Sequence, residues 1–209
     1  LEKGKEVIDE LEADLVALPE HRLNFRHKHN RNRLQQMFQG GEADIRAIAA
    51  HNVHENVSKH QEGGTALIAY GTVVDQYDFE HSGKDDTGLG RWVTMVFRGS
   101  EGVTTRVVCA YNPCYNNRKE SRTFYQQNRR YFIMKQKDRT CPRKRFREDV
   151  RCVVLELNRV SNDDCFVLDA RQFAFLPLLL HRQQLLDGDL RRWLGGDLLL
   201  GIDHVVGAG

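Results

Sequence analysis

The chain has 209 residues and a net charge of +2, and it is long enough to bury a hydrophobic core as one large domain or two small ones. Its composition, 40% hydrophobic and 29% charged with only 4 Pro and 17 Gly, excludes a disordered or collagen-like chain. The longest apolar run, around residues 173–180, contains Pro177 and falls well short of the ~20 residues of a membrane-spanning helix, so we expect no membrane partner. The first residue, Leu1, follows no basic and apolar leader, which indicates a fragment or a processed piece.

The cysteines indicate the compartment. They are five in number and include no CxxC pair, which favours a reduced intracellular protein over a disulfide-bonded secreted one. Nothing in the sequence distinguishes nucleus from cytoplasm or indicates an oligomeric state.

The first 20 residues predict a helix followed by a strand. Apolar residues at helical spacing among glutamates favour an amphipathic helix over residues 8–15. The apolar run 15–18, ended by Pro19, has the length of a short buried strand. Glu20 would then lie at the tip of that strand.

The next segments alternate strands with turns. Residues 44–51 fit either a helix or a strand, and residues 65–70, directly after Gly63-Gly64, have the length and composition of a strand. Residues 75–90 are rich in Asp, Gly and Ser and lack apolar periodicity, which predicts a long exposed loop.

A hairpin and two helices are predicted next. Residues 91–97 and 104–111 have strand character and are joined by a glycine-containing turn. Thr123 and Gln126 form a capping-box pattern for a helix that continues to about residue 135. A second helix is expected from Pro142, with one apolar stripe formed by Phe146, Val150, Val153, Val154 and Leu157.

The two predicted helices lie in a basic block. Between Arg118 and Arg151 there are thirteen Arg or Lys residues and four Asp or Glu, a local balance of +9, which leaves −7 for the rest of the chain. A block of this kind favours a polyanion, and so predicts nucleic acid as the partner. Two well-solvated basic helices are the alternative.

Three predicted strands end in a polar side chain. Glu20 and Tyr111 close two of them, and an apolar run over residues 165–168 leads to Asp169. A sheet would gather such ends at one edge. Carboxylate oxygens suit Mg²⁺ or Mn²⁺, a tyrosine can donate a hydrogen bond to a phosphoryl oxygen, and a second carboxylate can orient an attacking water.

The order of these motifs resembles the endonuclease/exonuclease/phosphatase superfamily, whose fold is DNase I-like. The resemblance covers about residues 1–170 and is greatest to the endonuclease-like domains of mobile elements. It is carried, in chain order, by residues 13–20, 63–65, 90–91, 111–113 and 168–171.

The resemblance implies an α/β fold: a partial DNase I-like two-sheet β-sandwich flanked by helices, without the family's first strand. Residues 171–209 would be a divergent C-terminal segment. The resemblance also implies that Glu20 binds Mg²⁺ or Mn²⁺, that Tyr111 contacts the scissile phosphate and that Asp169 orients water. Asp203 and His204 would supply the closing Asp-His pair, in which His takes a proton or stabilises charge; residues 201–205 equally resemble the Ile-Asp strand that precedes this pair in the family.

The chain also departs from the family pattern. Leu168 and Arg171 stand where the Gly and Asn of the family's Gly-Asp-x-Asn motif are expected. A cation beside Asp169 would weaken its role. The sequence therefore predicts a metal-dependent endonuclease-like phosphodiester hydrolase, with three outcomes open: an active enzyme, a catalytically inactive nucleic-acid-binding remnant, or a phosphatase of the same superfamily.

Overall fold

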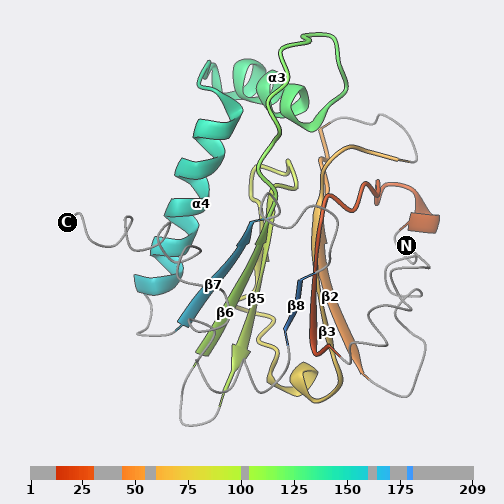
Figure 1. The fold of residues 1–209 in the computed structure, drawn as a ribbon, viewed down its shortest axis with the longest axis vertical. Coiled ribbons are helices and arrows are strands. Elements are labelled where there is room, and N and C mark those ends of the chain that lie inside the picture. The colour runs from red at the N-terminus through yellow and green to blue at the C-terminus, as the bar shows by residue number, and fades with distance from the viewer. Residues whose placement is uncertain are drawn as a thin grey trace.

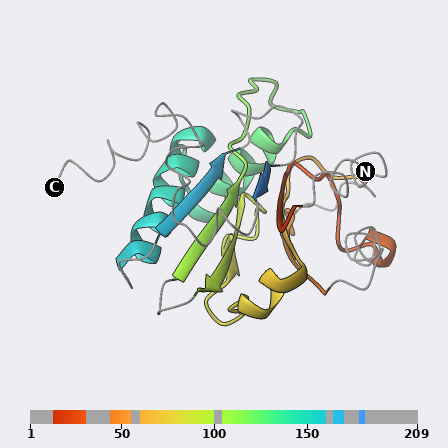
Figure 2. The same cartoon turned by 60° about the horizontal axis from the view of Figure 1, so that its bottom comes forward.

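Two four-stranded β-sheets face each other in the computed structural model, with helix α4 on the outer face of one of them (Figures 1 and 2). The structure describes residues 13–30, 44–54, 60–99, 104–159, 164–169 and 178–180. The architecture is mixed α/β, as predicted. Residues 8–12 of the predicted N-terminal helix lie outside the described residues, and its last residue, Leu15, begins strand β1 instead. In the described part of the chain, no helix is long and apolar enough to cross a membrane.

The first sheet has the order β2-β3-β1-β8, with every neighbouring pair antiparallel. Its strands are β1 (Leu15–Pro19), β2 (Ile45–Ala50), β3 (Thr65–Tyr70) and β8 (Leu178–Leu180). The predicted strands at 15–18 and 65–70 are confirmed, and residues 45–50 take the strand alternative. The edge strand β8 comes from the segment predicted to diverge from the family.

The second sheet has the order β4-β5-β6-β7. Its strands are β4 (Gly83–Lys84), β5 (Trp92–Arg98), β6 (Thr104–Ala110) and β7 (Asp164–Asp169). Strands β5 and β6 form the predicted antiparallel hairpin, whereas β6 and β7 are parallel. The connection from β6 to β7 contains helices α3 (Phe124–Gln136) and α4 (Pro142–Arg159).

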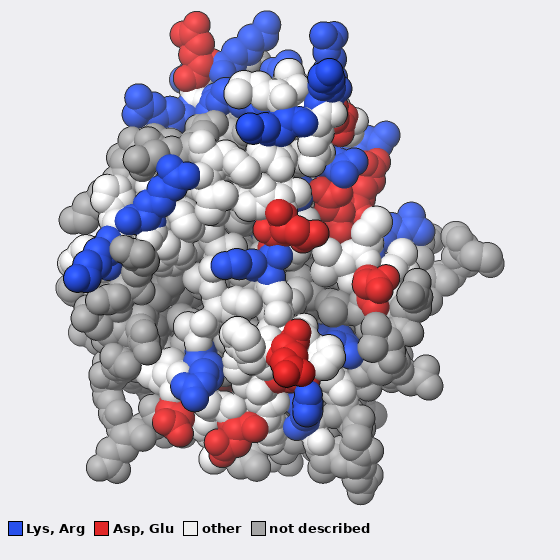
Figure 3. Space-filling view, turned by 180° about the vertical axis from the view of Figure 1, so that it is seen from behind, with Lys and Arg blue, Asp and Glu red and all other residues white. Residues whose placement is uncertain are grey.

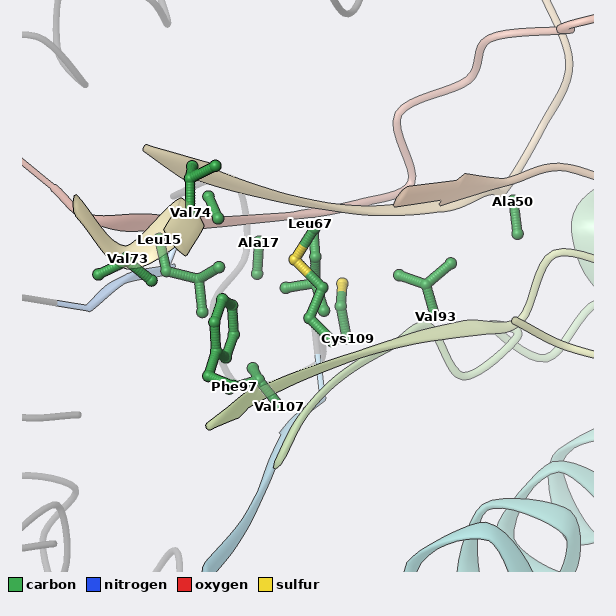
Figure 4. Close-up of a cluster of buried hydrophobic side chains, with 12 residues drawn as sticks. Leu15, Ala17, Ala50, Leu67, Val73, Val74, Val93, Phe97, Val107 and Cys109 are labelled. Atoms are coloured by element: carbon green, nitrogen blue, oxygen red, sulfur yellow. The ribbon is translucent and has the colours of Figure 1, made fainter. Parts of the chain in front are cut away.

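The core lies between the sheets (Figure 4). Alternate residues of β1, β3, β5 and β6 point inward, among them Leu15 and Ala17 of β1 and Val107 and Cys109 of β6. The other face of β6 presents Val108 and Ala110 to α4, where they pack with Phe146. The second half of β6, residues 107–110, is a continuous apolar run because both of its faces are buried.

Both predicted helices are confirmed, but the predicted capping box is wrong. Thr123 is the N-cap of α3, yet its side chain makes no capping hydrogen bond. Its hydroxyl pairs with that of Ser121, and the Gln126 amide donates to the backbone carbonyl of Asn116. Both side chains therefore fix the preceding loop instead of the helix terminus.

The prediction of a long exposed loop at residues 75–90 is also wrong. A 3₁₀ helix, η1 (Gly71–Gln76), and strand β4 lie in or next to it, and Asp78, Asp85 and Leu89 are buried. The carboxylate of Asp85 accepts hydrogen bonds from Arg91 Nε at 2.9 Å and from the Arg91 backbone N–H at 3.0 Å. Polar residues in this segment are buried because they satisfy one another.

Candidate functional site

The turn that follows β1 has an unusual backbone. Glu20 has φ 55° and Arg22 has φ 58°, a left-handed conformation that is rare for residues other than glycine. Distant backbone holds it, because the Arg22 N–H donates to the carbonyl of Gly63 at 3.0 Å and the Gln61 N–H donates to the carbonyl of Arg22 at 3.0 Å. Strained residues that are retained in this way cluster at functional sites.

The buried side chain of His21 holds this turn in place. Its Nε2 donates to the carbonyl of Ala50 at 2.9 Å, and its Nδ1 accepts from the Leu23 N–H at 2.9 Å, so the ring is neutral. Burial is the main cause that lowers the pKa of His21 to about 4. Gly64 makes room for the ring, since a Cβ at this position would lie 2.5 Å from the His21 Cε1 atom.

Tyr111 lies near Glu20, although the two residues follow strands of different sheets. It follows β6 directly, and the Glu20 carboxylate lies close enough to affect the ionisation of its hydroxyl. Burial, together with the hydrogen-bonding effect and the charge of Glu20, raises the pKa of Tyr111 above its usual range. The phenol therefore keeps its proton and acts as a hydrogen-bond donor.

The Gly63-Gly64 pair explains how the two residues come together. The Tyr111 ring packs on Phe124 at the start of α3, with ring centroids 5.3 Å apart. Gly63 lies against Phe124, where any Cβ would overlap the ring. The glycine pair thus lets the turn after β1, the end of β6 and the start of α3 approach one another.

Arg22 is a residue of this site that the sequence did not indicate. Its Nη2 lies 2.9 Å and its Nε 3.2 Å from Glu20 Oε1, and its Nη2 lies 3.6 Å from Glu62 Oε2. The hydrogen bond and charge of Glu20 raise the pKa of Arg22. Residues two apart rarely face each other, and here the left-handed turn brings them together. No sequence signal points to this pair.

The strand end of Asp169 lies next to that of Tyr111. In the parallel register of β6 and β7, Ala110 is the Cα partner of Asp169, so the two strands end side by side. The structure describes the backbone of Asp169 but not its side chain. Asp203, His204 and Arg171 lie outside the described residues.

A metal at this site would depend on few protein ligands. Among the described residues, no group of three or more His, Cys, Asp or Glu side chains is arranged to hold an ion. Mg²⁺ often keeps several waters and binds through one or two carboxylates together with substrate phosphates. The partly exposed Glu20 carboxylate, whose hydrogen bonds from Arg22 both reach Oε1, fits such an open site in its donor chemistry.

A basic surface adjoins the site. Lys and Arg side chains gather at the end of the molecule that carries α3, whereas elsewhere on this face they mix with acidic ones (Figure 3). The exposed basic residues of the loop before α3, of the two helices and of the turn between them are Arg118, Lys119, Arg122, Lys135, Lys137, Arg139, Lys144, Arg147 and Arg151. The predicted basic helices therefore do present their charge to solvent.

Buried Arg91 fixes these helices to the second sheet. It is fully buried, and its Nη1 donates to Asp149 of α4 at 2.6 Å. Its guanidinium also lies over the rings of Trp92 and of Phe132 in α3, at 4.3 and 5.4 Å from the ring centroids. One side chain thus contacts the sheet and both helices.

No protein-family model, no curated protein and no solved structure matches this chain. Function is therefore inferred from the residues and the geometry of the site.

Proposed function

We propose that this chain is a metal-dependent phosphodiester hydrolase of the endonuclease type, built on a divergent DNase I-like scaffold of the endonuclease/exonuclease/phosphatase superfamily. One observation carries the proposal: the Glu20 carboxylate and the Tyr111 hydroxyl, at the ends of two strands from opposite sheets, lie close enough to interact. The end of β7 at Asp169, beside that of β6, supports it. The two facing sheets and the outer helix are compatible with such a scaffold.

Each residue has a proposed task. Glu20 would hold Mg²⁺ or Mn²⁺, which when bound supplies positive charge that stabilises the phosphate as it reacts. Tyr111, which keeps its proton, donates a hydrogen bond to a phosphoryl oxygen. Asp169 orients the attacking water, and Asp203 orients His204, which takes a proton or stabilises charge. Arg22 is placed to pair with a phosphate oxygen.

The substrate class follows from the charge around the site. A small phosphorylated headgroup would need only the residues at the strand ends, whereas a nucleic acid also contacts a surface with many cations. The exposed basic residues of α3, α4 and the preceding loop favour nucleic acid over the small esters of a phosphatase.

Plasmid nicking tests the proposal. We expect the full chain to relax supercoiled DNA in Mg²⁺ or Mn²⁺ and not in chelator, and Glu20→Gln to remove this activity. Tyr111→Phe is expected to lower the rate about 10²- to 10³-fold, the usual effect of removing one donor to a developing oxyanion. Glu62→Gln is the matched control, because Glu62 also contacts Arg22 but is more exposed than Glu20. Cleavage that persists in Glu20→Gln, or the absence of cleavage with either metal, would refute the proposal.

The Arg22 contact favours a second candidate, a nucleic-acid-binding remnant without turnover. A guanidinium on Glu20 Oε1 opposes the approach of a divalent cation. This candidate predicts binding that weakens steeply between roughly 50 and 200 mM salt, because phosphate contacts release counterions, without metal-dependent nicking. Binding that is insensitive to salt would contradict it.

A further inference from the structure

An exposed aromatic side chain stands beside the candidate site. Tyr115 is 64% exposed, although tyrosine has a large apolar ring whose burial is favourable. It lies four residues after Tyr111 in the loop before α3. The two tyrosines are therefore at most about 15 Å apart along the chain, which is roughly four nucleotide steps of about 3.4 Å on one strand.

Tyr115 is held in place from one side. Its ring meets that of Tyr125 edge to face, with ring centroids 5.3 Å apart and an interplanar angle of 71°. Tyr125 is buried in the first turn of α3, directly after the Phe124 ring that supports Tyr111. The same helical turn thus positions the phenol of the candidate site and the exposed ring.

The loop that carries Tyr115 is anchored at the residues that follow the ring. The carbonyl of Asn116 accepts from the Gln126 amide, and the carbonyl of Arg122 accepts from the Gln127 amide at 2.7 Å. The carbonyl of Ser121 accepts from Arg130 at 3.0 Å. A loop anchored in this way presents its ring at little further loss of conformational entropy on binding.

The charged side chains that follow Tyr115 in the loop are mostly positive. Arg118, Lys119 and Arg122 follow it in the same loop and are exposed, with Glu120 the only acid among residues 112–123. Cations along a backbone path and an aromatic ring for stacking are the two parts of a surface that binds single-stranded nucleic acid.

From this arrangement we infer that Tyr115 stacks on an unpaired base of the nucleic acid whose phosphate binds at Glu20 and Tyr111. The inference rests on the proposed function and narrows its substrate to nucleic acid with a single-stranded or unstacked segment at the site. In a duplex, the bases next to the bound phosphate are stacked on each other and offer this ring no free face.

Binding measured without metal tests this. The probe is a fluorescein-labelled single strand of about 12 thymidines, within the span of known single-strand sites, compared with a duplex of the same length. Fluorescence anisotropy is recorded in chelator for the full chain and for Tyr115→Ala, Tyr115→Phe and Phe79→Ala. Phe79 is the matched control, because it is 78% exposed and lies in a different loop, between two acidic residues.

Tyr115→Ala is expected to weaken single-strand binding about 5- to 100-fold, the usual effect of losing one stacked base. Tyr115→Phe and Phe79→Ala should retain the affinity, and duplex binding should not change. Circular dichroism and thermal unfolding check that the variants are folded. Equal loss for single strand and duplex, an unchanged single-strand affinity in Tyr115→Ala, or an equal loss in Phe79→Ala would overturn the inference.

The nicking assay separates this inference from the proposed function. Tyr115-dependent binding without cleavage would reject the hydrolase and keep the stacking site. Cleavage that requires Glu20, with binding that does not depend on Tyr115, would keep the hydrolase and reject the stacking site.

Discussion

Acid should destabilise this fold through His21. The buried ring is neutral, and its pKa is lowered from 6.5 to about 4, chiefly by burial. Between these two values the unfolded chain binds a proton that the folded protein excludes, so the free energy of unfolding falls as the pH falls. Above pH 6.5 the contribution is complete. Each pKa unit corresponds to about 1.36 kcal/mol, so the loss approaches ~3 kcal/mol near pH 4.

A second histidine acts in the same direction. Burial, together with the charges of Arg26 and Lys84, lowers the pKa of His51 to about 4. The ring of His51 is less completely buried than that of His21, so solvent reduces its share. The wild-type slope should therefore exceed that of His21 alone.

Urea unfolding at several pH values between about 7.5 and 4.5 measures the effect. His21→Gln keeps polar atoms for the contacts with Ala50 and Leu23 but has no proton to gain, so its stability should depend less on pH than that of the wild type. His29→Gln, an exposed histidine on the same segment, is the matched control. If His21→Gln changes the stability at pH 7.5 but leaves the wild-type slope, then the titration of His21 is not the cause.

Three further predictions concern buried charge, the glycine pair and the Arg22 contact. Arg91→Ala should lower the free energy of unfolding by about 3–5 kcal/mol, because it leaves the buried Asp85 carboxylate without a charged partner; a loss under 1 kcal/mol in urea unfolding would contradict this. Gly64→Ala should cost at least about 1–2 kcal/mol from its φ of 89° alone and should also reduce nicking, since the new Cβ displaces the turn that carries Glu20; full activity would show that the turn is not needed. Arg22→Ala should lower the Mg²⁺ concentration for half-maximal nicking about 5-fold or more, because a unit charge about 4 Å away in a water-like surrounding is worth ~1 kcal/mol, and an unchanged Mg²⁺ titration would refute it.

The strands were predictable from the sequence where burial of both faces gives a continuous run of apolar residues. Residues 15–18, 66–69 and 107–110 are apolar because sheet, helix or loop covers both of their faces. The positions of Glu20 and Tyr111 directly after strands were predictable, but the expectation of one shared sheet edge was wrong, since β1 and β6 lie in different sheets. The polar composition of residues 75–90 predicts an exposed loop, and this prediction is wrong because Asp85 is buried in an ion pair with an arginine.

The setting of Glu20 was not predictable, because it depends on residues distant in the chain. Glu20 and Arg22 keep a left-handed backbone because the carbonyls of Gly63 and Gly64 and the His21 ring hold the turn. Local sequence propensity does not predict contacts of this kind. The same turn places the Arg22 guanidinium on the Glu20 carboxylate, the group proposed to bind the metal. The side chains of Arg22 and Glu20 are 56% and 28% exposed, and an exposed pair of this kind is worth only about 0.2–1 kcal/mol. In the proposed hydrolase, a divalent cation with a bound phosphate would offer both partners a stronger contact, so the guanidinium would move from carboxylate to phosphate as substrate binds. The ion pair that would weaken metal binding in the free protein would then become a contact with the substrate.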